Sequence, residues 1–353
     1  MNKRNSNIEL LRIIAMSFIV MGHFICQNEL IPDSNFIDTF IFVFLGRGHR
    51  IAVNIFLIIG IWFLFNVDFK WIRIAKLYGQ VLFYCWPLTV ISFFLWGSHC
   101  SVKDIIKGVF PFWGRALWFA TAYITLILIA PYLNKILEWN RKKLTTLVIF
   151  AVLFVSVMSS ISNSDSDYIC DSMWFVVVYI IIGYVKKYQI QIKWRNIFNL
   201  VMGMAIYLVL VWATTFCYIN SESKILVNIG RIASQYLSDI KSLPSIAIAY
   251  FIFEFFNNMK NRTIEWVNFI AKSSFSVYIF HQTPAFYPIL WNGLLSISII
   301  KNGSIISVIL VTFLIYFFVS IIDILRRYIE PIWLKIPFIC RIGNRLNKLY
   351  CEL

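Results

Sequence analysis

The sequence predicts an all-α integral membrane protein with about ten transmembrane helices and both termini in the cytoplasm. Hydrophobic residues make up 60% of the chain, charged residues only 14%, and the mean hydropathy is +0.75. Soluble domains are roughly half apolar and about a quarter charged, so this chain exposes apolar surface to lipid. Aromatic residues reach 18%, which suits lipid-facing walls and interfacial belts. We therefore expect one membrane domain over residues 1–353 and no separate soluble domain.

The individual helices follow from the length of the apolar runs. A helix needs about 20 mainly apolar residues to cross the hydrocarbon core. Ten runs approach this length, although the sixth and eighth are short. The predicted spans are 8–27, 51–67, 79–97, 117–136, 145–161, 173–185, 197–218, 243–257, 273–293 and 305–325.

The positive charges lie in alternate connectors, which predicts the orientation. About 22 of the 32 lysine and arginine residues fall on the side of the N-terminus. Because cytoplasmic connectors carry the excess of lysine and arginine, both termini are expected inside, and reporters near Asp165 outside. Charges distributed in this way do not form a nucleic-acid-binding stripe, so we expect no nucleic-acid partner. The inner group includes Lys3, Arg4, Arg141, Lys142, Lys143, Lys186, Lys187, Lys193, Arg195, Lys260, Arg262 and Lys272.

Three segments are expected to lie along the membrane surface or, in the case of the first two, to dip back into the membrane. Two outer connectors, 28–50 and 219–242, contain apolar stretches that are too short to cross the bilayer. The segment 327–353 alternates basic with aromatic or aliphatic residues, which predicts an amphipathic helix on the inner leaflet. Membrane lipids are therefore expected partners.

The first predicted span carries three ionisable residues, Glu9, Arg12 and His23. Each costs about 2.5–3.5 kcal/mol inside a membrane and so commonly marks a functional site. At about 100° per residue, Arg12 and His23 differ by only about 20° around the axis and lie about 16 Å apart along it. All three form one polar stripe. Alternatives remain for each residue: Arg12 can reach the headgroups, Glu9 can be its ion-pair partner, and His23 can be structural.

Two further groups stand out in later segments. Arg73 and Lys76 are three residues apart on one helical face, where they can bind phosphate or simply obey the charge rule for cytoplasmic connectors. Tyr278 and His281 lie on adjacent turns near the outer end of the ninth span. We expect His49 and His99, in outer connectors, to be ordinary. No histidine or cysteine spacing indicates a metal site.

These residues resemble the motifs of acyltransferase family 3. The stretch from Asn7 to His23 is similar to the opening helix of that family and keeps ten residues between arginine and histidine. The stretch from Val53 to Gly60 resembles its second-helix motif, with Asn54 at the acidic or amide position and Ile59 in place of the usual serine. Arg73 to Lys76 is similar to its R-x-x-R element. Later matches are Leu117-Trp118-Phe119 and the stretch from Phe275 to His281.

The resemblance implies a membrane O-acyltransferase of a bacterial inner (cytoplasmic) membrane. Its donor would be cytoplasmic acyl-CoA, most often acetyl-CoA, and its acceptor a hydroxyl of a surface or lipid-linked glycan. Cationic Arg73, Lys76 and Arg12 would face the CoA phosphates. His23, with Arg12 and Glu9, would act as general base or carry the acyl group transiently. Tyr278, His281, Asn54 and Trp118 would line the pocket.

Two other classes of function remain open at this point. A transporter can use an intramembrane Glu/Arg/His stripe as a proton relay or substrate path, and broken helices would favour that reading. A polysaccharide polymerase or flippase would be equally aromatic and polytopic but independent of CoA. The acceptor, the length of the acyl chain and the oligomeric state are not encoded in any motif of the sequence.

Overall fold

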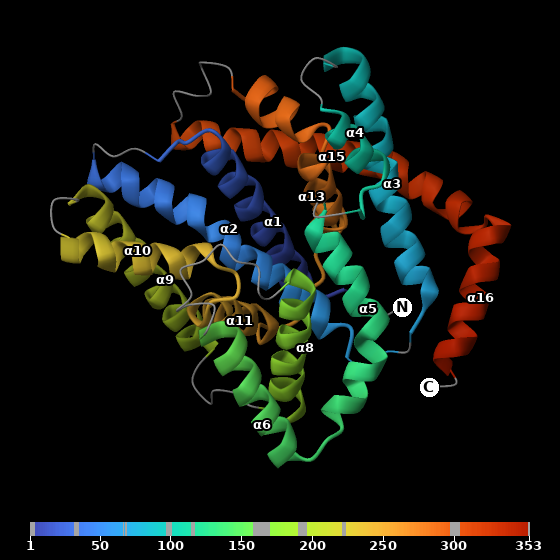
Figure 1. Cartoon of the computed structure of the whole chain (residues 1–353), viewed down its shortest axis with the longest axis horizontal. Coiled ribbons are helices and arrows are strands. Elements are labelled where there is room, and N and C mark those ends of the chain that lie inside the picture. Colours follow the sequence, from blue (N-terminus) through green and yellow to red (C-terminus); the bar gives the residue numbers. More distant parts are fainter. Residues whose placement is uncertain are drawn as a thin grey trace.

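The computed structural model describes residues 4–31, 35–65, 67, 69–96, 101–113, 117–157, 170–189, 196–220, 224–296 and 304–351. All regular elements in these ranges are helices, and no strand occurs among them (Figure 1). Among the described residues, six helices are long and apolar enough to cross a membrane. They are α1 (Ser6–Gln27), α2 (Phe36–Trp62), α3 (Trp71–Trp96), α5 (Trp118–Leu137), α9 (Asn196–Ile219) and α15 (Ile305–Leu334).

The remaining helices are shorter. The apolar helix α11 (Leu243–Asn257) coincides with the predicted eighth span. The all-α membrane class is thus confirmed, whereas the count of ten spans stays a prediction. The other short helices are α4 (Val102–Val109), α6 (Arg141–Ala151) with the π-helical turn η2 (Val152–Val157), α8 (Asp171–Lys187), α10 (Lys224–Ser238), α12 (Glu265–Ala271), α13 (Ser274–Gln282), η3 (Ile289–Leu294) and α16 (Pro337–Cys351).

The second helix begins 15 residues earlier than the sequence predicts. Instead of an interfacial segment followed by a span from residue 51, one helix runs over Phe36–Trp62. The cluster Arg47-Gly48-His49-Arg50 suggested a connector, but these residues lie in the interior of α2. Asn35 caps the start of the helix by accepting a hydrogen bond from the Ile37 amide. The early start brings His49 into the bundle.

The predicted ninth span is also different, because it is a broken helix. The chain forms α13 over Ser274–Gln282, turns at Thr283 to Phe286, and ends in the π-helical turn η3. Pro284 and Pro288 explain the break, since proline removes an amide donor and clashes with a continuing helix. Non-helical backbone at membrane depth occurs where it is covered by protein or lines a cavity. Thr283 and Ala285, within the break, are 0% exposed.

Helix α1 packs along α2 near the centre of the bundle, and it also contacts α11, α12, α13 and α15 (Figure 1). Val20 and Phe24 of α1 are fully buried. Gly22 is the point of closest approach: a Cβ built there would lie 2.4 Å from the Cβ of His49. Only a glycine permits this spacing, which therefore fixes the relative position of the two helices.

The predicted surface segments form helices. The segment 219–242 contains the amphipathic helix α10, and the tail contains α16, which packs on α3. However, α15 extends to Leu334, so the first residues of the predicted tail continue the long helix. Arg73 and Lys76 likewise lie within α3 and not in a connector. Lys3, His99, Asp165, Asp167, Lys193 and Arg195 lie outside the described residues.

Candidate active site

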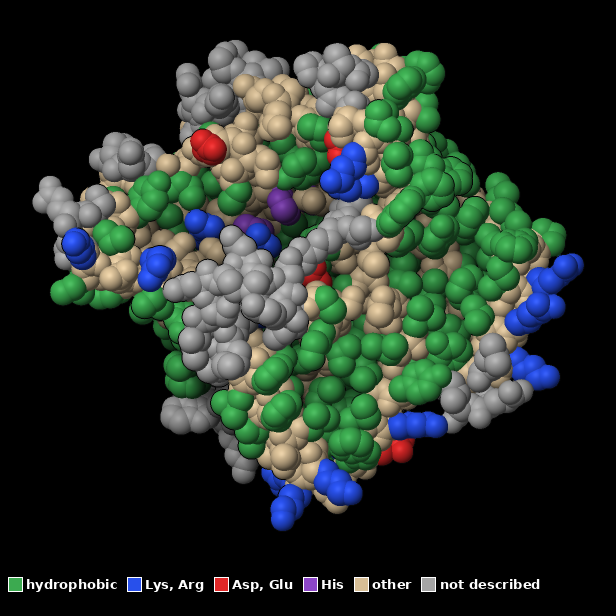
Figure 2. Space-filling model, viewed as in Figure 1, with side chains coloured by type: hydrophobic (Ala, Val, Ile, Leu, Met, Phe, Trp, Pro, Cys, Tyr) green, Lys and Arg blue, Asp and Glu red, His purple; other side chains and the backbone are tan. Residues whose placement is uncertain are grey.

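Three histidines from three helices meet near the C-terminal end of α1. The ring of His23 (α1) lies 5.4 Å, centroid to centroid, from the rings of both His49 (α2) and His281 (α13). His49 and His281 are only 5% and 0% exposed, whereas His23 is partly exposed. We call this group the histidine cluster. Figure 2 shows histidine side chains in a hollow of the surface, with lysine or arginine side chains beside them.

Backbone carbonyls orient the two outer rings of the cluster. The Nδ1 atoms of His49 and His281 lie 2.5 Å from the Gly46 carbonyl oxygen and 2.6 Å from the Val277 carbonyl oxygen. Since a carbonyl only accepts, each Nδ1 carries the proton and each Nε2 keeps a lone pair. The Nε2 of His281 is buried and has no hydrogen-bond partner among the described residues. The cluster therefore presents an unused acceptor nitrogen beside His23.

His49 was missed by the sequence analysis, which expected it to be ordinary. The surrounding glycines and arginines resembled a loop, and this hid its position inside a helix. One signal was available: Gly22 directly precedes His23, and a helical glycine marks a place where another element comes close. Nothing in the sequence identified which element that is.

Arg12 lies in the part of the polar stripe on α1 that is nearer to the N-terminus. Its NH1 lies 2.9 Å from Glu9 Oε2, and Arg4 pairs with the other oxygen of Glu9 at 3.6 Å. The predicted ion pair between Glu9 and Arg12 is thus present. Arg12 is partly buried and lines a cavity at this end of the bundle.

The cavity has a volume of about 590 Å³, and several lysine and arginine side chains line it. We call it the inner cavity, because it lies at the end of the bundle that is predicted to be cytoplasmic. Three carboxylates pair with these cations: Glu9 with Arg4 and Arg12, Glu330 with Lys76 and Arg326, and Asp323 with Arg326. The cations outnumber these three carboxylates, which suits a ligand with several phosphate charges. The cationic lining residues are Arg4, Arg12, Lys76, Lys272, Arg326 and Arg327.

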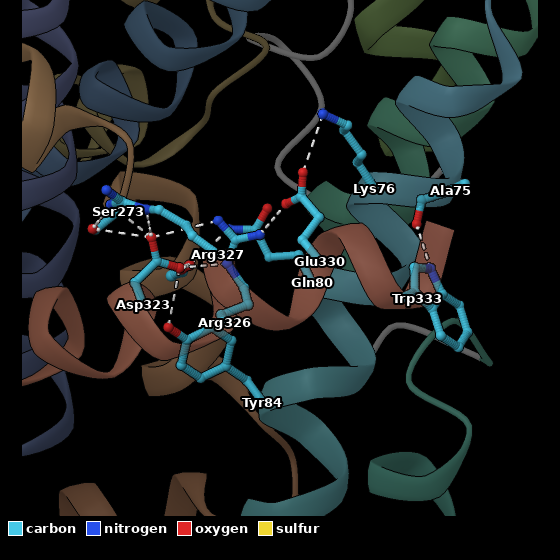
Figure 3. A network of polar contacts seen from close by, with 11 residues as sticks. Ala75, Lys76, Gln80, Tyr84, Ser273, Asp323, Arg326, Arg327, Glu330 and Trp333 are labelled. Carbon is cyan, nitrogen blue, oxygen red and sulfur yellow. Dashed lines mark hydrogen bonds and ion pairs between the residues drawn. The ribbon is translucent and has the colours of Figure 1, made fainter. Parts of the chain in front are cut away.

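A buried carboxylate, Asp323 of α15, holds two of these cations in place (Figure 3). Asp323 is 0% exposed and accepts from Arg326 Nε at 2.6 Å and from Arg327 Nε at 2.8 Å. It also accepts from the hydroxyls of Ser273, Ser276 and Tyr84. Donors from five residues satisfy its charge, as a buried carboxylate requires. The sequence analysis did not single out Asp323.

Glu330 joins α3 to α15 at the edge of the inner cavity (Figure 3). Its Oε1 lies 3.1 Å from Lys76 Nζ, and its Oε2 pairs with Arg326 NH1. One carboxylate thus occupies two of the cations that face the cavity. Arg73 is not among the described residues that line the cavity, whereas Lys76, one turn further along α3, is.

An aromatic wall separates the inner cavity from the histidine cluster. Phe119 and Phe275 line the cavity, and the centroids of both rings lie 5.7 Å from that of Tyr278. Tyr278 in turn lies 6.2 Å from the His281 ring. Ring contacts thus lead from the lining of the cavity through Tyr278 to His281.

The other predicted pocket residues have neighbours in the core. Asn54 is 0% exposed and donates to the Ile240 carbonyl and the Ser245 hydroxyl, while it accepts from Trp174. All its polar groups thus serve contacts between helices. Trp118 begins α5 and its ring contacts Phe119 and Phe175. Ile59, at the usual serine position, is buried in the hydrophobic core.

Within the part of the chain that the structure describes, no group of three or more histidine, cysteine, aspartate or glutamate residues has a geometry for a metal ion.

The comparison with protein families matches residues 5–324 to an acyltransferase domain, that of acyltransferase family 3. No curated protein and no solved structure matches the chain. Because the matched range covers nearly the whole chain, this membrane protein belongs to acyltransferase family 3.

Proposed function

We propose that the protein transfers an acyl group, most simply acetyl, from cytoplasmic acyl-CoA to a hydroxyl of a surface or lipid-linked glycan. One observation carries this proposal: the ring contacts of Phe119, Phe275 and Tyr278 link a basic cavity to a histidine cluster. A phosphate-rich donor and a hydroxyl acceptor require these two chemistries within reach of each other.

The proposed topology has ten spans with both termini in the cytoplasm. The inner cavity gathers Arg4, Arg12, Lys76, Lys272 and Arg326, all of which come from segments with the cytoplasmic charge pattern. This agreement supports the orientation, because segments distant in sequence bring their cations to one end of the bundle. The inner cavity then opens where acyl-CoA is made.

In the proposed reaction, His23 is the general base. A neutral imidazole takes the proton of the sugar hydroxyl while the hydroxyl oxygen attacks the thioester carbonyl. The carbon–sulfur bond breaks, and the leaving CoA thiolate receives the proton. His49 and His281 position the His23 ring, since their carbonyl-bound Nδ1 groups leave Nε2 lone pairs toward the cluster. Transient acylation of His23 is the other route, in which imidazole nitrogen attacks the thioester first.

The cations of the inner cavity would bind the CoA phosphates. Arg326 and Arg327 are fixed by Asp323, so their guanidinium groups lose little freedom when a phosphate binds. Lys76 keeps its charge but lacks the planar fork of arginine, so its contact has less directional control. Phe119 and Phe275 would contact the less polar arm that carries the acyl group.

The broken segment from Ser274 to Leu294 favours a second function, transport. Broken helices form the central binding sites of many transporters. The two functions differ in their need for CoA. Purified protein in lipid nanodiscs, given acetyl-CoA and glycan acceptors, should release free CoA thiol and form an equal amount of ester. Uptake or export of a glycan without any thiol release would support transport instead.

A further inference from the structure

A second polar pocket lies between α2, α9 and α10, on the side predicted to be external. It has a volume of about 350 Å³ and is lined by Arg47 of α2, Thr214 of α9, and Arg231 and Ser234 of α10. None of the described residues that line it is acidic. We call it the outer pocket. Two guanidinium groups and three side chains with hydroxyls, Thr214, Tyr218 and Ser234, thus line one pocket, and the rest of its lining is apolar.

Several of these groups have no partner in the part of the chain that the structure describes. Thr214 is only 6% exposed, and its hydroxyl has no hydrogen-bond partner. The Nε of Arg47 is also buried and unpartnered, although its NH1 donates to the Ser238 hydroxyl at 2.9 Å. A buried donor without a partner costs about 1–3 kcal/mol, and more for a charged group. An anion between these donors would remove that cost.

The packing of α10 on α9 builds the pocket. A Cβ on Gly230 would lie 2.2 Å from the Cβ of Cys217, so a glycine is required where these helices touch. The close contact holds α10 against α9, so that Arg231 of α10 lines the same pocket as Arg47 of α2. The charge of the pocket is therefore a consequence of the fold.

A path of positive charge connects the outer pocket to the histidine cluster around α2. At about 100° per residue, Arg50 lies about 60° from Arg47 and about 100° from His49, and so stands between them on the helix surface. Arg50 is half-buried. An acceptor held in the outer pocket would extend along this face of α2 toward His49.

We propose that the outer pocket binds an anionic group, carboxylate or phosphate, of the acceptor, so that the protein acylates an acidic glycan. Paired guanidinium groups recognise such groups through charge-assisted hydrogen bonds. The proposal rests on the acyl-transfer function for the identity of the acceptor, whereas the pocket itself is tested by binding.

The binding test uses D-glucuronate and inorganic phosphate as probes, and D-glucose as the neutral match of the first. With the full-length protein in nanodiscs of zwitterionic lipid, both anions should bind and glucose should not. Arg47→Gln and Arg231→Gln should each weaken anion binding about tenfold to a hundredfold, as expected for hydrogen bonds to charged groups. Thr214→Val should weaken it about two- to tenfold. Lys224→Gln, on the same helix but outside the pocket, is the matched control and should change nothing.

Thr214→Val separates binding from folding. Because the hydroxyl has no partner among the described residues, valine of nearly equal shape should leave thermal stability unchanged or higher while it lowers anion binding. Anion binding that is absent from the parent protein, or equal in the parent and all three pocket variants, would overturn the proposal. Loss of glucuronate binding when phosphatidylglycerol is added to the nanodiscs would assign the pocket to a lipid headgroup and also overturn it.

The acylation test compares a uronate-containing oligosaccharide with a neutral one of the same length. The acidic acceptor should have the higher kcat/KM, and Arg47→Gln should remove the difference. Equal acylation of both acceptors by the parent would refute the acidic acceptor while leaving acyl transfer intact. Acylation of neither acceptor would contradict the transferase function, and the binding test would still decide the fate of the pocket.

Discussion

The contact between Gly22 and His49 makes the spacing of the histidine cluster testable by a single methyl group. An alanine Cβ at position 22 would lie 2.4 Å from His49 Cβ and 2.6 Å from His49 Cγ and Nδ1. Ordinary contact begins at 3.4 Å, so the two atoms closest to each other must separate by about 1 Å. Rotation of the His49 ring does not relieve a clash with its own Cβ. The backbone of α2 must therefore move away from α1.

A displacement of about 1 Å at a reacting group can cost about a hundredfold in rate. Gly22→Ala should accordingly lower kcat by about this factor, because His49 no longer positions the His23 ring. The donor KM should stay near the parental value, since residue 22 lies about 15 Å along α1 from Arg12. Turnover of purified protein at saturating acetyl-CoA measures both constants, with monodispersity and Tm recorded to confirm folding.

Gly293→Ala is the matched control, because a Cβ at that position meets nothing within 4 Å. It should retain parental activity. A folded Gly22→Ala variant with parental kcat would refute the claim that the α1–α2 contact sets the geometry of the site. A raised donor KM with unchanged kcat would likewise contradict the assignment of this end of α1 to the chemical step.

Three further predictions concern the inner cavity and the topology. Asp323→Asn should raise the donor KM about tenfold to a hundredfold, because Arg326 and Arg327 lose the carboxylate that aligns them. Glu330→Gln should lower the donor KM about two- to tenfold, because it releases Lys76 and Arg326. Enzyme kinetics with varied acetyl-CoA will show whether the two variants change the donor KM in opposite directions. The double variant Arg73→Ala with Lys76→Ala should weaken CoA binding in a salt-dependent manner, while Lys76→Arg should leave CoA affinity unchanged or slightly higher. Parental CoA affinity of the double variant would mean that both residues only set the membrane topology. Reporter fusions at Lys142 and after Leu353 should be cytoplasmic and fusions near Asp165 external, and an external reporter at Lys142 would contradict the ten-span topology.

Composition and periodicity were sufficient to predict the all-α membrane class and most helix positions. Apolar runs coincide with their helices because a helix that crosses the bilayer needs about 20 apolar residues. A shorter apolar helix such as α11 fits where protein covers its ends. The start of α2 could not be predicted in this way. Its charged cluster at residues 47–50 lies inside the bundle, where tertiary contacts override a local pattern typical of a connector.

The polar stripe on α1 was also predictable, since the angle between Arg12 and His23 follows from helix geometry alone. Its partners were not, because they come from sequence positions far from α1. His49 approaches through one glycine contact, and Asp323 collects donors from three helices. Asn54 shows the reverse: it lies in a motif, yet its amide is fully engaged in contacts between α2 and its neighbours.

The central claim is that His23 performs the chemical step and that the inner cavity binds the donor independently of it. The most direct test measures CoA binding and acyl transfer by His23→Ala in the same nanodisc preparation. Transfer should fall by at least about 10²–10⁴, the usual contribution of a general base, while the Kd for CoA remains parental. Near-parental transfer by His23→Ala would contradict the account and leave His281 and Tyr278 as the groups to examine.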